Sequence, residues 1–295
     1  MQTIDLEKIT TDNLSLPAYR EKDVEVDVLR IDKIHPVVSG NKWFKLRYYL
    51  EEAKQQQKST ILTFGGAWSN HIVATAAACR LNNFSSIGMI RGEEPVTPSA
   101  TLQEARQLGM QLVFLSREAY KSKQLPASLR NRDDCYIIGE GGYGITGAKG
   151  AATILDHALK NKYTHICCAA GTGTMTAGLL LHPYQADVIS VSVLKNNFQL
   201  EDDIRHLVNI KKKPAIINDY HFGGYAKHTP SLLSFMNEFY KQATIPSDFV
   251  YTGKLFFAIN DLVSNNYFKQ GSKLLVIHSG GLQGNRSLSK GTLIF

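Results

Sequence analysis

The segment from Ser39 to Leu46 carries the residues best suited to chemistry. It reads Ser-Gly-Asn-Lys-Trp-Phe-Lys-Leu, so Lys42 follows a Gly-Asn turn signal and begins an apolar-periodic run. Asn41 can cap a helix here, which places Lys42 in the first turn and Lys45 on nearly the same face. The positive end of the helix dipole and a second cation both disfavour a protonated amine. The pattern is compatible with a nucleophilic lysine, although taken alone it fits two solvated surface lysines better.

A second candidate segment follows the apolar run His165 to Ala170 and reads Gly-Thr-Gly-Thr-Met-Thr-Ala-Gly from Gly171. Backbone amides at a helix start and threonine hydroxyls can donate to an anion. The segment is not a P-loop, and it lacks the third glycine and the ribose-binding acid of a dinucleotide fingerprint. We interpret it as a phosphate cradle, with a plain strand-to-helix turn as the alternative. Together with a reactive lysine, it indicates pyridoxal phosphate.

Composition sets the broad class of the protein. The chain has 295 residues, of which 43% are hydrophobic and 20% charged, with a net charge of +7. The basic residues are dispersed, and we interpret the run from Lys211 to Lys213 as a solvated loop, so we expect no nucleic-acid partner. We see no signal peptide and no apolar window of about 20 residues, so we expect a cytoplasmic protein without a membrane span. The four cysteines lack metal-type spacing and are expected to be reduced thiols, most of them buried.

The elements that position these residues alternate along the chain. Apolar strands are expected at 60–64, 86–90, 111–115, 136–138, 165–169, 188–193 and 273–278. Helices are expected at 70–81, 101–108, 147–159 and 231–242. This alternation predicts an α/β fold with mostly parallel sheets covered on both faces, and we place a junction between two sheets at 147–150. Ligands bind beyond the carboxyl ends of such strands, so the glycine loops at 65–71, 139–144, 171–178 and 279–281 are the candidate site.

With a candidate lysine and a candidate phosphate cradle in these loops, the chain resembles the 1-aminocyclopropane-1-carboxylate deaminase / D-cysteine desulfhydrase family. The motifs that carry the resemblance are Ser39-Gly40-Asn41-Lys42-x-x-Lys45-Leu46, Phe64-Gly65-Gly66-x-x-Ser69-Asn70-His71, the Gly171 loop, Gly224-Tyr225, Tyr251-Thr252-Gly253-Lys254 and His278-Ser279-Gly280-Gly281. The resemblance implies a fold type II pyridoxal-phosphate enzyme of the tryptophan-synthase-β-like group, with two three-layer αβα domains. It also implies a homodimer, a larger cofactor domain at 1–47 and 148–295, and a smaller domain at 48–147.

The resemblance also implies a role for each candidate cofactor residue. Lys42 resembles the lysine that bonds to the cofactor aldehyde, and Asn70 the residue that bonds its 3-hydroxyl. Ser279 resembles the residue that faces the pyridine nitrogen, and Lys45 is counted with the cofactor-binding residues. The phosphate loop is carried over to Gly171, Thr172, Gly173, Thr174 and Met175. For Asn70, a helix cap is the alternative reading.

Substrate and acid–base roles come from the same resemblance. Ser69, Asn70 and His71 resemble the start of the loop that holds the substrate carboxylate, whose amides begin a helix. Tyr225 and Tyr251 resemble the two active-site tyrosines and join Lys42 and Ser69 as candidate catalytic residues. Without the family context, each tyrosine would be interpreted as a packing residue, and His71 as a helix-start residue.

Two positions separate the members of this family. The resemblance implies that the deaminases have a glutamate after the second tyrosine and a leucine before the last Gly-Gly. This chain has Thr252 and Ser279 at those two positions. A hydroxyl near the pyridine nitrogen favours elimination of a β-substituent over ring opening, so we predict D-cysteine desulfhydrase-like chemistry on a small amino acid. The alternatives are 1-aminocyclopropane-1-carboxylate deamination and, more remotely, a cofactor-binding protein without turnover. The residues after His71 depart from the usual pattern, which leaves the substrate open.

Overall fold

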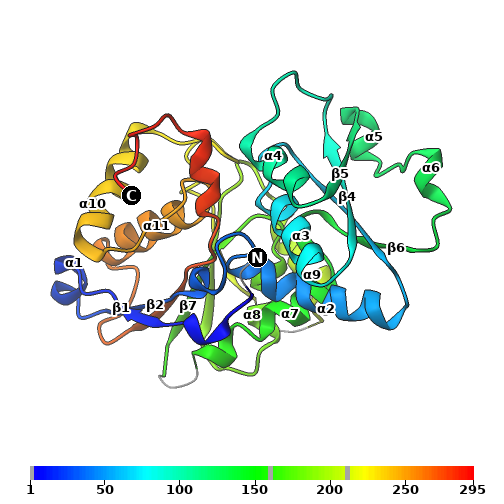
Figure 1. The fold of residues 1–295 in the computed structure, drawn as a ribbon. Helices are drawn as coiled ribbons and strands as arrows, with labels where there is room; N and C mark the ends of the chain where they lie inside the picture. Colours follow the sequence, from blue (N-terminus) through cyan, green and yellow to red (C-terminus); the bar gives the residue numbers. More distant parts are fainter. Residues whose placement is uncertain (1–2, 159–161, 210–212) are drawn as a thin grey trace.

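The computed structural model describes residues 3–158, 162–209 and 213–295 (Figure 1). Lys211 and Lys212 of the predicted basic loop lie outside these residues, as does position 159 at the end of a predicted helix. Within the described residues, no helix combines the length and the apolar character that crossing a bilayer requires. The four cysteines are unpaired, and Cys79, Cys167 and Cys168 are buried, as expected.

The larger sheet draws its strands from both ends of the chain. Its order is β1-β2-β10-β7-β8-β9, and all neighbours are parallel except β1 and β2. The strands are β1 (Thr11–Asn13), β2 (Glu25–Leu29), β7 (His165–Ala170), β8 (Asp187–Ser192), β9 (Ala215–Ile217) and β10 (Lys273–Ile277). In this register, Val276 of β10 lies between Val28 of β2 and Cys167 of β7.

The larger sheet is covered on both faces. Val28, Cys167 and Val276 pack into one hydrophobic cluster, whereas their chain neighbours Leu29 and Ile277 pack into another. Because successive strand residues point to opposite faces, this division shows two buried faces and a three-layer arrangement. The surrounding helices are α1 (Pro17–Glu21), α2 (Asn41–Gln55), α7 (Ile145–Ala152), α8 (Thr174–Leu181), α9 (Leu200–Leu207), α10 (Pro230–Ala243) and α11 (Thr252–Ser264).

The smaller sheet is fully parallel, with the order β5-β4-β3-β6. Its strands are β3 (Thr60–Gly65), β4 (Ser85–Arg91), β5 (Met110–Leu115) and β6 (Cys135–Ile138). The accompanying helices are α3 (Asn70–Leu81), α4 (Ala100–Gln107), α5 (Arg117–Lys121) and α6 (Ala127–Arg130). Figure 1 shows this unit beside the larger sheet, with α2, α7 and α8 below the region where the two meet. The predicted α/β class with two mostly parallel sheets is confirmed.

One predicted helix is too long. The predicted helix at 147–159 is α7, which ends at Ala152, and a short 3-10 turn, Leu155–His157, follows. The Thr153 hydroxyl donates to the Gly150 carbonyl over 2.7 Å, and such a local bond competes with helical continuation. The predicted domain boundaries stay a prediction, and both fall inside helices, one in α2 and one in α7.

Glycines let α7 lie close to its neighbours. A Cβ on Gly150 would come within 2.0 Å of the Phe44 carbonyl oxygen on α2, and one on Gly178 of α8 within 2.5 Å of the Ala148 carbonyl oxygen. Along the chain, α7 follows the last strand of the smaller sheet and precedes β7 of the larger one. The glycine-rich segment at 147–150 is therefore part of a tightly packed helix between the two sheets.

Candidate active site

The strand-ending glycine loops meet where the two sheets face each other. A Cβ on Gly141, in the loop after β6, would lie 3.0 Å from the Thr172 side chain, in the loop after β7. The Asn70 amide, at the end of the loop after β3, donates to the Gly281 carbonyl, in the loop after β10, over 3.4 Å. Loops from both sheets thus form one site at the carboxyl ends of parallel strands.

Lys42 stands in the first turn of α2, as predicted, but Asn41 does not cap this helix. The helix begins at Asn41, and Gly40 is the capping residue, with φ 58°. A Cβ on Gly40 would lie 2.0 Å from the Ser279 carbonyl oxygen, so only glycine fits. The Asn41 side chain instead accepts a hydrogen bond from the Lys42 Nζ over 3.0 Å. Close approach of the Ser279 loop, which the local sequence does not reveal, explains this difference.

The electrostatic setting of Lys42 favours the free amine. Burial lowers the pKa of Lys42 to about 8, and the Asp248 carboxylate opposes this shift. Burial, with the nearby Lys42 charge, also lowers the pKa of Lys45 well below its ordinary value. The Lys45 Nζ donates to the Gly141 carbonyl over 3.4 Å. The expected weakening of the ammonium form is therefore present, but desolvation is its main cause.

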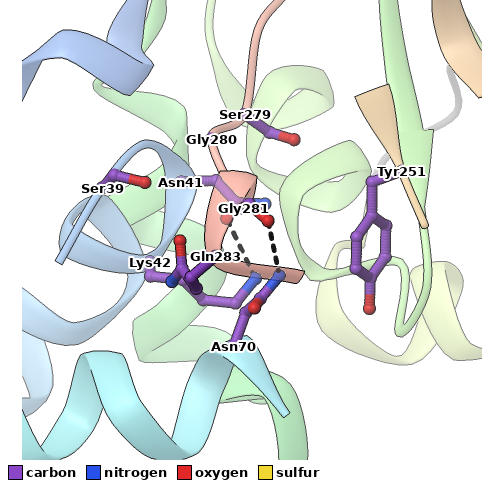
Figure 2. Close-up of a pocket in the computed structure, with 9 residues that line it drawn as sticks. All are labelled: Ser39, Asn41, Lys42, Asn70, Tyr251, Ser279, Gly280, Gly281 and Gln283. Atoms are coloured by element: carbon purple, nitrogen blue, oxygen red, sulfur yellow. Dashed lines mark hydrogen bonds between the residues drawn. The ribbon is translucent and has the colours of Figure 1, made fainter. Parts of the chain in front are cut away.

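A pocket lies directly over Lys42 (Figure 2). Of the predicted site residues, Lys42, Asn70, Tyr251 and Ser279 line it. The other lining residues are Ser39, Asn41, Gly280, Gly281 and Gln283. Figure 2 shows Lys42 and Asn70 on one side and Tyr251 across from them, with the Lys42 Nζ 5.8 Å from the centre of the Tyr251 ring. The Asn70 Oδ1 is buried without a hydrogen-bond partner.

The predicted phosphate loop also lies beside Tyr251. A Cβ on Gly171 would lie 3.4 Å from the Tyr251 ring, so the loop and Lys42 share this tyrosine as a neighbour. Gly173, with φ 76°, is the N-cap of α8 and has no side chain, so the first amides of the helix are free of a capping side chain. The hydroxyls of Thr172 and Thr174 lie 3.0 Å apart. The Met175 side chain packs into the core, so only its backbone is available for an anion.

The two predicted tyrosines are in contact. The rings of Tyr225 and Tyr251 meet edge to face, with 6.2 Å between their centroids. Burial raises the pKa of both phenols, and the hydrogen bond between their hydroxyls raises the pKa of Tyr251 and lowers that of Tyr225. Both hydroxyls therefore keep their protons near neutral pH and can act as donors.

Ser69 and His71 flank the start of α3. Ser69 is the capping residue, but its side chain makes no capping bond, so its hydroxyl is not used by the helix. The buried His71 Nε2 lies 2.8 Å from the Thr63 hydroxyl, which donates its own proton to the Ile138 carbonyl. The Nε2 must therefore carry the imidazole proton, and Nδ1 is a buried acceptor without a partner. Burial and the two lysine charges lower the pKa of His71 well below its usual value, so the ring is neutral.

Asp248 is a site residue that sequence reasoning missed. Its buried carboxylate accepts hydrogen bonds from the amides of Val250, Tyr251 and Thr252. The Thr252 hydroxyl donates to the same carboxylate over 2.7 Å, and Thr252 is not among the residues that line the pocket. An aspartate just before an apolar helical run is typical of a helix start, and this signal could have identified it. Burial raises the pKa of Asp248, and these hydrogen bonds oppose the rise.

These residues suit pyridoxal phosphate. A lysine with a lowered pKa can react with its aldehyde, and the unpartnered Asn70 Oδ1 can accept a hydrogen bond from its hydroxyl. The open helix start at Thr174 offers amides to an anion such as its phosphate. A two-sheet α/β fold with such a site between the sheets defines an enzyme of the fold type II class that depends on this cofactor.

Comparison with known proteins agrees. The family described as "Pyridoxal-phosphate dependent enzyme" matches residues 16–280, so the chain belongs to this family and its cofactor is pyridoxal 5'-phosphate. It is 26% identical to a putative 1-aminocyclopropane-1-carboxylate deaminase of Pyrococcus horikoshii, covering 90% of this chain and 87% of the relative. It is 29% identical to a mitochondrial bifunctional D-cysteine desulfhydrase/1-aminocyclopropane-1-carboxylate deaminase of Arabidopsis thaliana, covering 88% and 73%. The crystal structure of an ACC deaminase homologue superposes with a TM-score of 0.81 at 26% identity, covering 94% and 90%.

Proposed function

We propose that the chain is a lyase that removes a β-substituent from a small amino acid, in the manner of a D-cysteine desulfhydrase. Water and D-cysteine would give pyruvate, ammonia and hydrogen sulfide. The observation that carries the proposal is the Lys42 amine, whose pKa is lowered to about 8 beside Asn70 and Tyr251. When bound, pyridoxal phosphate takes up the electron pair that the substrate α-carbon releases.

The side chains around Lys42 supply the proton transfers. The free Lys42 amine removes the α-proton, and positioned bases of this kind contribute about 10²- to 10⁴-fold to the rate. A protonated tyrosine hydroxyl, on Tyr225 or Tyr251, gives its proton to the departing sulfur. The amides at the start of α3 and the Ser69 hydroxyl hold the substrate carboxylate. The neutral His71 ring adds no charge beside that carboxylate.

The choice of elimination over ring opening rests on Ser279 and Thr252. Ser279 lines the pocket, and it stands where the resemblance implies a leucine in the deaminases. Thr252 stands where the resemblance implies a glutamate in the deaminases, and its hydroxyl donates a hydrogen bond to Asp248. This position therefore supplies no carboxylate to the pocket. A ring nitrogen that faces a hydroxyl holds its proton less firmly than one that faces a carboxylate. This setting supports the loss of a good leaving group such as thiolate.

The alternative is deamination of 1-aminocyclopropane-1-carboxylate to α-ketobutyrate and ammonia. The names of the Pyrococcus relative and of the matching crystal structure support it. The Arabidopsis relative is named for both activities. A cofactor-binding protein without turnover is the remaining alternative.

The test compares products from the purified protein loaded with pyridoxal phosphate. We expect pyruvate and sulfide from D-cysteine, slower turnover of L-cysteine, and little α-ketobutyrate from 1-aminocyclopropane-1-carboxylate. Lys42→Ala should abolish the visible absorption band of the bound cofactor and the activity, whereas the exposed Lys241→Ala should leave both intact. Dominant α-ketobutyrate formation would establish the alternative. A protein that binds the cofactor but responds to no D- or L-amino acid would be one without turnover.

We further propose that the protein acts as a homodimer in the cytoplasm, with 48–147 as a smaller domain. The family resemblance supports the homodimer and the smaller domain, and the unpaired, mostly buried cysteines support the cytoplasm. Sedimentation equilibrium gives the mass of the assembly directly, and a monomer at micromolar concentration would rule out the dimer.

A further inference from the structure

A buried amine lies next to the active-site tyrosines and has no role in the proposed reaction. Lys254, in the first turn of α11, is 0% exposed. Its Nζ donates to the His221 carbonyl over 2.8 Å and to the Gly224 carbonyl over 2.7 Å. These two carbonyls lie at the ends of the turn that leads directly into Tyr225. The single amine therefore ties both ends of that turn to one helix.

The turn needs such support because its backbone is unusual. Phe222, Gly223, Gly224 and Ala226 all have positive φ angles, of 50°, 95°, 115° and 52°. For residues with a side chain, this conformation is costly and persists only where the surroundings enforce it. The segment from Tyr220 to Thr229 belongs to no strand or helix. Tyr225 therefore lies in a strained loop, and its hydroxyl is hydrogen-bonded to that of Tyr251.

The same side of α11 contacts this segment at two further points. Phe257 packs edge to face on Phe222, with 4.9 Å between ring centroids. Asp261 accepts a hydrogen bond from the Tyr220 hydroxyl over 2.6 Å. Lys254, Phe257 and Asp261 are spaced three and four residues apart, which places them in one row along the helix. Tyr251 caps the start of the same helix. The positions of Tyr225 and Tyr251 are therefore both set by contacts with α11.

We propose that Lys254 is a positioning residue that sets Tyr225 against Tyr251 across the active site. The amine does so by holding the His221 and Gly224 carbonyls, and it does not touch substrate or cofactor. The consequence for catalysis rests on the proposed function, because it assumes that Tyr225 takes part in the reaction. The effect on the geometry of the loop does not depend on that function.

The first experiment measures the loop without any substrate. Lys254→Met keeps much of the side-chain volume but removes the donor. The Gly224 and Lys227 amides donate to the same two carbonyls that Lys254 holds, those of His221 and Gly224, and we expect hydrogen exchange at both amides to speed up by about tenfold. Lys254→Gln, which keeps a donor, should give a smaller increase. The matched control, the exposed Lys241→Met on α10, should leave exchange in the loop unchanged. Unchanged exchange in Lys254→Met would overturn the proposal.

The second experiment tests whether Lys254 acts through Tyr225. With a substrate that the loaded enzyme converts, Lys254→Met should lower kcat by about 10- to 100-fold, with KM changed far less, because small displacements of a catalytic group have effects of this size. In a Tyr225→Phe background, Lys254→Met should cause no further loss in kcat. Losses that multiply would show a general structural role and overturn the proposal. Tyr220→Phe, which loosens the loop from Asp261, gives an independent variant if Lys254→Met does not fold.

The two experiments separate the failure of this proposal from that of the proposed function. If no amino acid is converted, faster exchange in Lys254→Met still supports the positioning role, and unchanged exchange still overturns it. If an amino acid is converted and exchange is unchanged, the proposed function stands without the role of Lys254.

Discussion

At the scale of single residues, the environment of Lys42 decides its reactivity. The amine lies in a helix start beside Lys45 and is largely desolvated, while Asp248 offsets part of the effect. A lysine in water has a pKa of about 10.4 and is almost entirely protonated at neutral pH. A pKa of about 8 gives a substantial fraction of free amine at physiological pH.

This shift predicts how cofactor uptake depends on pH. Only the free amine attacks an aldehyde, so the rate at which cofactor-free protein takes up pyridoxal phosphate should rise as the pH increases toward about 8 and then level off. Stopped-flow absorbance over pH 6 to 10.5 measures this rate, with Lys42→Ala as the blank. A rate that continues to climb to about pH 10, as for a solvated lysine, would show that the amine is not desolvated.

Four of the residues that line the pocket were predictable from the sequence because their motifs are local. Lys42, Asn70, Tyr251 and Ser279 each stand in a short glycine-containing motif, and the structure brings them together. Asp248 was missed because its importance comes from three backbone amides and from charges on distant segments. The change in the role of Asn41 has a similar cause, namely contact with the Ser279 loop.

At the scale of elements, the start of α2 depends on contact with the loop after β10. Gly40 needs both a positive φ and room for the Ser279 carbonyl, whereas Gly271 has a similar φ of 77° but no atom near its missing Cβ. At Gly40 the ψ of −140° places the backbone in a region open only to glycine, so strain and steric overlap act together there. Gly271 shows the cost of a positive φ without overlap.

We predict that Gly40→Ala is far more damaging than Gly271→Ala. Gly271→Ala should cost about 1 kcal/mol of unfolding free energy through strain alone. Gly40→Ala adds overlap with backbone and should cost more than about 3 kcal/mol. It should also weaken binding of pyridoxal phosphate, because it displaces the first turn that holds Lys42. Urea unfolding and a cofactor titration measure the two effects, and equal stability losses would contradict the argument.

Most elements were predictable because their patterns are long. The strands of the smaller sheet and α3 match the apolar runs and helical spacing closely. Three strands, β1, β2 and β9, were not predicted. β1 and β9 are three residues each, too short to show alternation, and in β2 the acidic Glu25 and Asp27 interrupt the apolar run. The early end of α7 depends on one threonine hydroxyl, which a periodicity argument does not weigh.

At the scale of the whole molecule, the site belongs to both sheets. Asn70 and His71 begin the helix after β3 of the smaller sheet, whereas Tyr251 and Ser279 come from segments that pack on the larger one. A bound cofactor would contact both, so its binding free energy stabilises the two units together. Which strands share a sheet could not be read from the alternation alone, because β2 and β10 lie near opposite ends of the chain.

We therefore predict that pyridoxal phosphate raises the thermal midpoint of one joint transition. At a free concentration 100 times the Kd, the stabilisation amounts to about 2.7 kcal/mol. Differential scanning calorimetry of the protein with and without cofactor measures the shift, and Lys42→Ala should reduce it strongly. Two resolved transitions, of which only one moves, would argue against a site shared between the sheets.

The pairing of β2 with β10 has a consequence for biosynthesis. On the ribosome, the amino-terminal strand emerges long before its neighbour Val276, and the Gly40 turn before the Ser279 loop against which it packs. The nascent chain must keep the unpaired edge of β2 away from other chains in the meantime. We therefore expect the Gly40 turn and Lys42 to reach their final positions, and pyridoxal phosphate to be held there, only after β10 and the Ser279 loop have been made.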